Sequence, residues 1–393
     1  MTTQKIAIVG GGVIGLAVAR ALALQGVQVT IFEQQHIGAG TSSTTFAWVN
    51  SNGKQPLSYH QLNALSMEEH TRLQLSQTNG LRWLETCGTW EWAAEGEAQQ
   101  RLRQRATSLQ SLGYPAREVS ADELQREVPD LRLQAVSGSV WHFPTESVLH
   151  PALYLSRLWS EARANGAVLH QQHAIERVSE QADGVTLHLT NGEQWQGDRV
   201  VIATGRWANQ LLNTLNLDLA LLDTSKPNAV ACSFLARTAP QPLSLSSNLI
   251  SPQLNVRPDG GGRLLLQALE LDDLADPASP PSLHGDIAQQ FRDRYQALFA
   301  DAGELQIENI VIGQRARPAD GLPAIGYVTP HQRVYVAVTH SGITLSPLIG
   351  KLVAQELVQD QASELLADFR PQRLLGKNAS DFAPIKRNFP AAQ

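Results

Sequence analysis

The first 33 residues constrain the fold most, because they combine an apolar strand, a glycine-rich turn, a helix and a second strand that ends in an acid. The first strand covers residues 5–9, the turn reads Gly10-Gly11-Gly12-Val13-Ile14-Gly15, and the second strand ends at Glu33. This order of elements is the dinucleotide-binding fingerprint in its required structural context. It predicts an α/β chain, α+β overall, with a Rossmann-type sheet.

Each glycine of the turn has a physical role in such a fingerprint. Gly10 permits the tight turn, Gly12 lets a pyrophosphate approach the backbone, and Gly15 lets the helix pack closely on the strand. The start of the helix offers unpaired N–H groups and the positive end of its dipole to phosphate. At the end of the second strand, Glu33 can accept hydrogen bonds from a ribose.

Composition excludes several classes of protein. The chain has 393 residues and a formal net charge of -6, with no block of basic residues, so we expect no nucleic-acid partner. Cys87 and Cys232 are isolated, which indicates neither a disulfide framework nor a metal site. No apolar run reaches the roughly 20 residues of a membrane helix. The first strand begins too close to Met1 for a cleavable signal, and we expect a cytoplasmic protein.

Strand and helix patterns recur along the rest of the chain. Apolar runs at 198–205 and 333–338 are typical of buried parallel strands, and the latter leads into an apolar helix at 343–357. The pattern also predicts a long helix or helix pair at 59–86, a helix start at 120–124 with Ser120 as N-cap, a helix at 152–164 and a strand at 167–171. A hairpin with an Asn191-Gly192 turn is expected at 185–196. Three β-rich stretches are expected at 229–236, 249–256 and 263–271, and a last helix at 286–300.

Five separated segments resemble the D-amino-acid oxidase-like flavoproteins, a family that includes glycine and sarcosine oxidases and D-amino-acid dehydrogenases. These segments are the Gly10–Gly15 turn with Glu33, and residues 38–43, 200–207, 315–326 and 340–347. The resemblance implies FAD and a Rossmann-type FAD-binding domain interleaved with a strand-rich substrate domain. We expect the FAD-binding domain at 1–80, 150–215 and 305–370, the substrate domain at 81–149 and 216–304, and a C-terminal tail at 371–393.

The resemblance also implies which residues contact FAD. The first turn, the 38–43 segment, the 200–207 segment and the start of the last helix are expected to contact the ADP half, the pyrophosphate and the flavin. One backbone position between the strand at 167–171 and the hairpin at 185–196 is expected to contact the adenine. The expected residues are Gly10, Gly12, Val13, Ile14, Gly15, Glu33, Gln34, Ala39, Gly40, Thr41, Ser42, Ser43, Ala174, Ala203, Thr204, Gly205, Trp207, Gly342, Ile343, Thr344 and Leu345. Relatives with covalent flavin use a cysteine near residue 315 or a histidine after residue 43, and this chain has neither, so noncovalent FAD is expected.

The reaction that the resemblance implies is hydride transfer from an amine-bearing carbon to the flavin, giving an imine that hydrolyses to a 2-oxo acid. A bidentate arginine suits the substrate carboxylate. Counting back from Asp320-Gly321 selects Arg315, whereas matching the Arg-Pro pair of relatives selects Arg317, and on a strand both would share a face. His340 is a candidate to hydrogen-bond substrate or cofactor, or to hold the turn that follows it.

Several alternatives stay open. The substrate is expected to be a D-amino acid or an N-substituted amino acid, and the electron acceptor to be oxygen, a quinone or another carrier. Sarcosine-type oxidases place a lysine near the flavin, and residues 263–267, the expected counterpart here, contain none. This favours a dehydrogenase over an oxidase. Such a dehydrogenase could contact a membrane peripherally. A 2-hydroxy-acid dehydrogenase, an NAD-dependent enzyme and a noncatalytic flavin subunit are the competing functions. The oligomeric state is not predicted. Aromatic residues at 59–60, 90–92 and 141–143 are candidates either for a pocket or for the core.

Overall fold

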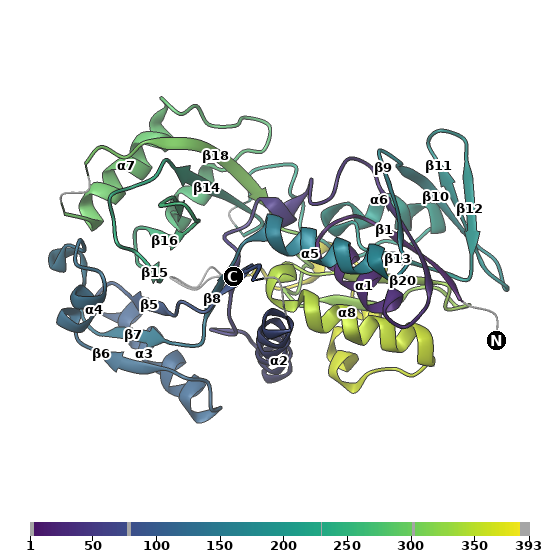
Figure 1. The fold of residues 1–393 in the computed structure, drawn as a ribbon, viewed down its shortest axis with the longest axis horizontal. Coiled ribbons are helices and arrows are strands. Elements are labelled where there is room, and N and C mark those ends of the chain that lie inside the picture. The colour runs from purple at the N-terminus through teal and green to yellow at the C-terminus, as the bar shows by residue number, and fades with distance from the viewer. Residues whose placement is uncertain (1–3, 77–79, 229, 301–302, 386–393) are drawn as a thin grey trace.

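A computed structural model describes residues 4–76, 80–228, 230–300 and 303–385. Two large sheets organise the chain, and each carries its own helices. Figure 1 shows a sheet with α1 and α8 on one side of the molecule and a second sheet with α7, α3 and α4 on the other. The segments that build the two sheets alternate along the sequence, as the interleaved architecture predicts.

The first sheet has six strands in the order β19-β20-β13-β1-β2-β9, parallel except for β19. In chain order these are β1 (Lys5–Val9), β2 (Gln28–Glu33), β9 (Val168–Gln171), β13 (Arg199–Ile202), β19 (Ala324–Tyr327) and β20 (Val334–Val338). Parallel sheets are usually covered on both faces, and here successive residues of β1 pack into different cores. Ile6 and Ile8 join one core, and Ala7 and Val9 join another. The mixed α/β fold class is therefore confirmed.

Helices cover one face of this sheet and strands cover the other. The helical side is formed by α1 (Val13–Ala23), α2 (Leu57–Leu75), α5 (Pro151–Ala164) and α8 (Gly342–Gln359). The opposite side is formed by a three-stranded sheet and a short helix: β10 (Ile175–Glu180), β11 (Val185–Leu189), β12 (Gln194–Gly197) and α6 (Ala208–Leu212). The predicted hairpin at Asn191-Gly192 is the β11–β12 turn.

The second sheet has eight strands in the order β18-β14-β17-β16-β15-β5-β7-β6, antiparallel except where β15 meets β5. Its strands and associated helices are β5 (Thr89–Trp92), α3 (Glu97–Ser111), β6 (Arg117–Val119), α4 (Ala121–Glu127), β7 (Val140–Phe143), β14 (Cys232–Thr238), β15 (Asn248–Ile250), β16 (Asn255–Pro258), β17 (Leu264–Gln267), α7 (Asp286–Leu298) and β18 (Ile307–Gln314). Ser120 caps α4 as predicted, its side chain accepting a hydrogen bond from the Glu123 N–H.

Alternation along β14 and β17 decides which side chains face the first sheet. Phe234 and Leu266 pack in one core with Phe291 of α7. Their neighbours Leu235 and Leu265 lie on the opposite face, in a small cluster with Phe46 and Trp48. This second face points toward the nucleotide-binding half of the chain. Ser233 and Gln267 lie on the same face, because each is two residues from Leu235 or Leu265 along its strand.

Three predicted boundaries are wrong. The helix expected over 59–86 ends at Leu75, and the chain then forms β4 (Leu84–Glu85), which pairs with β8 (Ser147–Leu149) beside β3 (Trp48–Val49); residues 77–79 lie outside the described residues. The β-rich stretch 263–271 ends as a strand at Gln267, and a 3-10 helix follows. β18 pairs with β14 in the eight-stranded sheet, although residues 305–370 were expected with the FAD-binding domain.

The segment after α8 is held against the six-stranded sheet by ion pairs. Arg370 binds buried Glu356 of α8, whose carboxylate also accepts a hydrogen bond from the Tyr335 hydroxyl at 2.6 Å. Arg373 donates to Asp320 at 2.6 Å. Residues 386–393 of the predicted tail lie outside the described residues. No described helix is long and apolar enough to cross a membrane, and within the described ranges no cluster of His, Cys, Asp or Glu could hold a metal ion.

Candidate functional site

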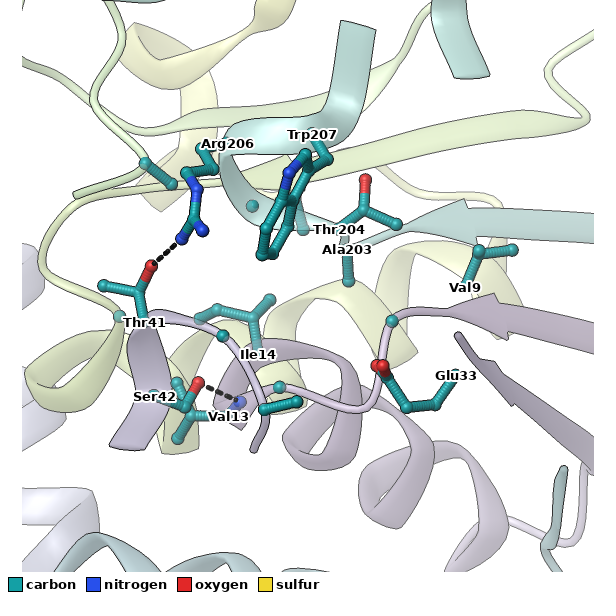
Figure 2. A pocket seen from close by; sticks show the side chains of 18 of the residues that line it. Val9, Val13, Ile14, Glu33, Thr41, Ser42, Ala203, Thr204, Arg206 and Trp207 are labelled. Atoms are coloured by element: carbon teal, nitrogen blue, oxygen red, sulfur yellow. Dashed lines mark hydrogen bonds between the residues drawn. The ribbon is translucent and has the colours of Figure 1, made fainter. Parts of the chain in front are cut away.

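The first cavity lies where the strands of the six-stranded sheet end and where α1 and α8 begin. Val9, Phe32, Ala203 and Ala337, at or next to the ends of β1, β2, β13 and β20, line it together with Gly342 at the start of α8. Ligands of open α/β sheets bind outside the carboxyl ends of the strands, and this cavity occupies that position. Figure 2 shows Val9, Ala203 and Glu33 around it.

The glycine turn has the geometry that the fingerprint predicts. Gly10 has φ +112°, and a Cβ there would lie 2.6 Å from the Ala203 carbonyl oxygen, so only glycine fits. A Cβ at Gly15 would lie 2.0 Å from the Gly10 carbonyl oxygen. The backbone N–H of Gly11 donates to Glu33 Oε2 at 2.7 Å, which holds this carboxylate at the end of β2 beside the turn.

Two helix N-termini meet at the first cavity. Ser42 Oγ accepts a hydrogen bond from the Val13 N–H at 2.9 Å, so the 38–43 segment lies directly on the start of α1 (Figure 2). The Ser341 N-cap of α8 makes no side-chain capping bond, and Gly342 packs against Val13 and Ile14. Both helix dipoles therefore favour negative charge in the same space. A dinucleotide pyrophosphate fits this arrangement.

Most predicted cofactor residues line the first cavity. They are Gly10, Gly12, Val13, Ile14, Glu33, Gln34, Ala39, Gly40, Thr41, Ser42, Ala203, Thr204, Gly205, Trp207, Gly342 and Ile343. Five others are not among its lining residues. Gly15 packs inside α1, Ser43 lies beside Gly38, Leu345 is fully buried, and Thr344 lines a second cavity. Ala174 lies between the lining residues His173 and Ile175, and its carbonyl accepts a hydrogen bond from the Thr190 N–H at 3.0 Å.

Sequence reasoning missed a cation in the first cavity. Arg206 donates a hydrogen bond to Thr41 (Figure 2), with Nη1 3.3 Å from Thr41 Oγ1. Its guanidinium lies 3.7 Å from the centre of the Trp207 ring. Burial lowers the pKa of Arg206. Its position immediately after Gly205, in a segment already assigned to cofactor binding, was the available signal.

A second cavity opens beside the first, and Thr41, Thr45, His340 and Ile343 line both. Its other walls come from the loop before β3 and from the eight-stranded sheet. The remaining lining residues are Thr44, Phe46, Ala47, Trp48, Lys54, Ser233, Leu235, Gln267, Gly313, Arg315, Ser341 and Thr344. A Cβ at Gly313 would lie 2.7 Å from the Thr44 carbonyl oxygen, so this glycine lets the loop pass close to β18.

The structure separates the two candidate arginines. β18 ends at Gln314, so Arg315 and Arg317 lie beyond the strand on which they were expected, although both side chains extend to the same carbonyl group. Arg315 lines the second cavity, whereas Arg317 is 7% exposed and is not among the lining residues. Both guanidinium groups approach the Val230 carbonyl oxygen, at 3.5 Å and 3.2 Å respectively. Asp320 pairs with Arg373 rather than with either of them.

His340 lies between the two cavities. Its ring centre is 6.2 Å from that of Tyr59, whose hydroxyl donates to Ser341 Oγ at 2.7 Å. These contacts tie α2 to the start of α8. Of the aromatic candidates, Trp90, Trp92, Trp141 and Phe143 fill cores of the second sheet.

The aromatic side chains that line the second cavity are Phe46 and Trp48, which sequence reasoning did not select for this role. Trp48 Nε1 donates to buried Glu146 at 2.8 Å, which fixes the indole ring. On the facing wall, Gln267 Nε2 donates to Ser233 Oγ at 2.8 Å. The cavity is therefore bounded by fixed side chains from both halves of the chain.

Neither Cys87 nor Cys232 is among the described residues that line the first or the second cavity. Cys232 lies opposite Gln314 in the β14–β18 pair, close to the Arg315 segment in space although not in sequence. Its Sγ is directed to the carbonyl oxygens of Thr224 and Lys226, both at 3.7 Å. Burial raises the pKa of both thiols.

Fold and cavity together define a flavoenzyme-like α/β protein with a dinucleotide cavity and an adjoining smaller cavity. The family model described as FAD dependent oxidoreductase matches residues 5–356. The chain belongs to this family, so the predictions of an enzyme and of FAD as its cofactor are confirmed. The glycine turn, the paired helix termini and Arg206 fit that cofactor.

Individual relatives are distant in sequence. The chain is 27% identical over 379 residues to glycine oxidase from Geobacillus kaustophilus (strain HTA426), covering 95% of this chain and 97% of that protein. The crystal structure of glycine oxidase from Geobacillus kaustophilus superposes with a TM-score of 0.81 and 23% identity, covering 95% of this chain and 99% of the other. The crystal structure of L-proline dehydrogenase from P. horikoshii superposes with a TM-score of 0.80 and 18% identity, covering 94% of this chain and 97% of the other. These two structural similarities establish the fold alone.

Proposed function

We propose that this enzyme oxidises the C–N bond of a small amino acid, with FAD in the first cavity and the substrate in the second. The observation that carries the proposal is the junction of the two cavities, with Arg315 lining the second. A guanidinium in a half-buried cavity suits a carboxylate, which it can bind through two parallel hydrogen bonds. The name of the Geobacillus relative, glycine oxidase, supports an amino acid as the substrate.

Each half of the chain has a separate task in this proposal. The six-stranded sheet and its loops hold FAD through the residues expected above, Ala174 included, and the eight-stranded sheet forms the substrate wall. Bound FAD supplies the acceptor for the hydride. The start of α8, from Gly342 to Leu345, favours negative charge where the two cavities meet, because its N–H groups and dipole are already oriented there.

The substrate is held by a cation and by apolar walls. Arg315 binds the carboxylate, and His340 lies at the junction, within reach of both ligands. Phe46, Trp48 and Leu235 limit access of water to the reacting carbon. The carbon loses a hydride, the amine becomes an imine, and water hydrolyses the imine to a 2-oxo acid and an amine or ammonia.

We further propose that FAD is bound noncovalently and that the electron acceptor is not oxygen. Cys232 lines neither the first nor the second cavity, and its sulfur faces the carbonyl oxygens of Thr224 and Lys226. The β17 residue that lines the second cavity is Gln267, an amide that cannot carry a positive charge, and the lysine among the described lining residues, Lys54, comes from the loop after β3 instead. A dehydrogenase of this kind would pass electrons to a quinone or another carrier. Acid precipitation should release all yellow colour, and reduced enzyme should reoxidise faster with a soluble quinone than with oxygen.

The decisive experiment is an anaerobic titration of the holoenzyme, followed at the flavin band near ~450 nm. Pools of D-amino acids and of N-alkyl amino acids are added separately. Bleaching by either pool supports the proposal, and dividing that pool identifies the substrate. If 2-hydroxy acids alone bleach the flavin, the enzyme oxidises a C–O bond and the proposal of C–N oxidation is wrong. If no pool bleaches the flavin, a noncatalytic flavin subunit becomes the better description.

A further inference from the structure

His70 is a buried histidine of α2 that faces the start of α8. It is fully buried, it is not among the described residues that line the first or the second cavity, and its Nε2 lies 2.8 Å from the Ile343 carbonyl oxygen. A carbonyl oxygen only accepts hydrogen bonds, so the imidazole carries its proton on Nε2. Burial lowers the pKa of His70 to about 4. Near neutral pH the ring is therefore an uncharged hydrogen-bond donor to this backbone carbonyl.

The Ile343 carbonyl needs an outside donor because α8 contains a proline. In a regular helix this carbonyl would accept from the N–H of residue 347, but Pro347 has no N–H, and its ring crowds the carbonyl four residues earlier. Ile343 is buried, and a buried carbonyl without a donor is costly. Ser346 Oγ also reaches this oxygen, at 3.2 Å. His70 makes the shorter of the two contacts that replace the missing helical bond.

The same face of α2 holds the start of α8 at two further points. The Tyr59 hydroxyl donates to Ser341 Oγ at 2.7 Å, and Ser66 Oγ accepts a hydrogen bond from the Leu348 N–H at 3.4 Å. Tyr59, Ser66 and His70 are spaced by seven and four residues, which places them on one side of the helix. This side of α2 therefore fixes where α8 begins.

The turn that His70 contacts borders both cavities. Gly342 lines the first cavity, Ile343 lines both, and Thr344 lines the second. The first N–H groups of a helix lack partners within it, and together with the helix dipole they favour negative charge. The Ile343 carbonyl carries partial negative charge in this same turn, and the His70 donor offsets it. Loss of the donor would release the turn and leave that partial charge beside the cavity junction.

We propose that His70 is a positioning residue for the flavin: by donating to the Ile343 carbonyl, it keeps the first turn of α8 in the orientation that favours a reduced, negatively charged flavin. This inference rests on the proposed function, because it places the reacting end of FAD where the two cavities meet. It does not depend on which substrate the enzyme oxidises.

The reduction potential of the bound flavin tests the inference without an amino acid. It is measured by anaerobic, dye-coupled reduction of the holoenzyme. His70→Leu removes the donor and keeps a side chain of similar size, and it should lower the ratio of reduced to oxidised flavin at a fixed potential by about threefold to tenfold, equivalent to about 14–30 mV for a two-electron couple. His70→Gln, whose amide can still donate, should restore most of the potential. Phe291→Leu, in the core of the second sheet, is the control: it should lower Tm and leave the potential unchanged.

A proline substitution tests whether His70 acts through this carbonyl. Pro347→Ala restores an N–H that can donate to the Ile343 carbonyl within α8. In this background His70→Leu should shift the potential by less than half of its effect in the otherwise unmodified enzyme. Equal shifts in the two backgrounds would overturn the inference. An unchanged potential in His70→Leu, or the same loss in Phe291→Leu, would overturn it as well.

Flavin content decides the case in which His70→Leu fails to hold FAD. If His70→Gln then retains both FAD and the potential, a donor at this position is required and the inference stands. If His70→Gln also loses FAD, the shape of the imidazole matters rather than its hydrogen bond, and the inference fails. Failure of the proposed function has a different signature: no amino acid would reduce the flavin, whereas the dye-coupled potentials would still follow the donor at residue 70.

Discussion

Replacing Arg315 with methionine should impair substrate binding while leaving the cofactor in place. In the proposed function this arginine binds the substrate carboxylate, and losing a charge-assisted contact of this kind costs roughly 2–4 kcal/mol. At about 1.36 kcal/mol per tenfold change, kcat/KM should fall by about 30- to 900-fold. The side chain lines the second cavity and not the first, so the ratio of bound flavin to protein should stay near that of the unmodified enzyme.

The fold should tolerate this substitution. The hydrogen bond from the Arg315 side chain to the Val230 carbonyl is 3.5 Å long, at the limit of such an interaction. Methionine replaces the aliphatic part of the side chain and removes a charge that burial disfavours. We expect Tm to change by no more than a few degrees. Steady-state kinetics, flavin absorbance and thermal unfolding measure the three quantities on one preparation.

Arg317→Met is the matched comparison, because Arg317 contacts the same Val230 carbonyl but does not line the second cavity. Its loss should change kcat/KM less than tenfold. The assignment is refuted if Arg315→Met retains normal kinetics while Arg317→Met loses activity. Loss of FAD in Arg315→Met would contradict the separation of the two cavities.

Three further substitutions test the cofactor turn, the buried acid and the core. Gly10→Ala should abolish or strongly weaken FAD binding, since its Cβ would lie 2.6 Å from the Ala203 oxygen, whereas Gly26→Ala, also at positive φ but with no atom within 4 Å, should keep the flavin. The folded pKa of Glu146 is raised from 4.5 to about 8, so its contribution to stability is lost as pH rises from 4.5 through 8. The Tm of Glu146→Gln relative to the unmodified enzyme should therefore increase between pH 6 and 9, and a constant difference would contradict the raised pKa. Phe291 of α7 is fully buried, and Phe291→Ala should lower the free energy of chemical unfolding by about 3–5 kcal/mol. A loss below about 1 kcal/mol would contradict that packing.

The parallel sheet was predictable because its signals are local. The apolar runs around 200 and 334 form β13 and β20, and the glycine turn fixes how α1 leaves β1. The wrong boundaries depend on pairing between distant segments. Leucine spacing continues past Leu75, but β4 pairs with β8, more than 60 residues later. The membership of β18 in the second sheet is likewise decided by its pairing with β14.

The residues that line the first cavity were predictable for the same reason, and those that line the second were not. Most of the residues that line the first cavity come from short motifs with fixed spacing. The loop 50–56, with its Asn, Ser, Gly and Pro, has the composition of a surface turn. Asn50, Ser51, Asn52 and Lys54 of this loop are nevertheless buried. Asn52 donates to buried Glu91 at 3.0 Å, and the Ser51 N–H donates to Tyr114 at 3.2 Å. Only tertiary partners bring Lys54 to the second cavity.

The segment from Thr41 to Thr45 couples the two halves of the site. Thr41 receives a hydrogen bond from Arg206 in the first cavity and donates one to the Gln314 carbonyl at 2.5 Å, at the end of β18 next to Arg315. In the proposed function, cofactor binding and substrate alignment therefore share one short piece of backbone. Other parts of the wall of the second cavity come from β14, β17 and the Lys54 loop. Because these elements do not line the first cavity, changes in them can alter the substrate without loss of FAD, and changes at Thr41 should affect both.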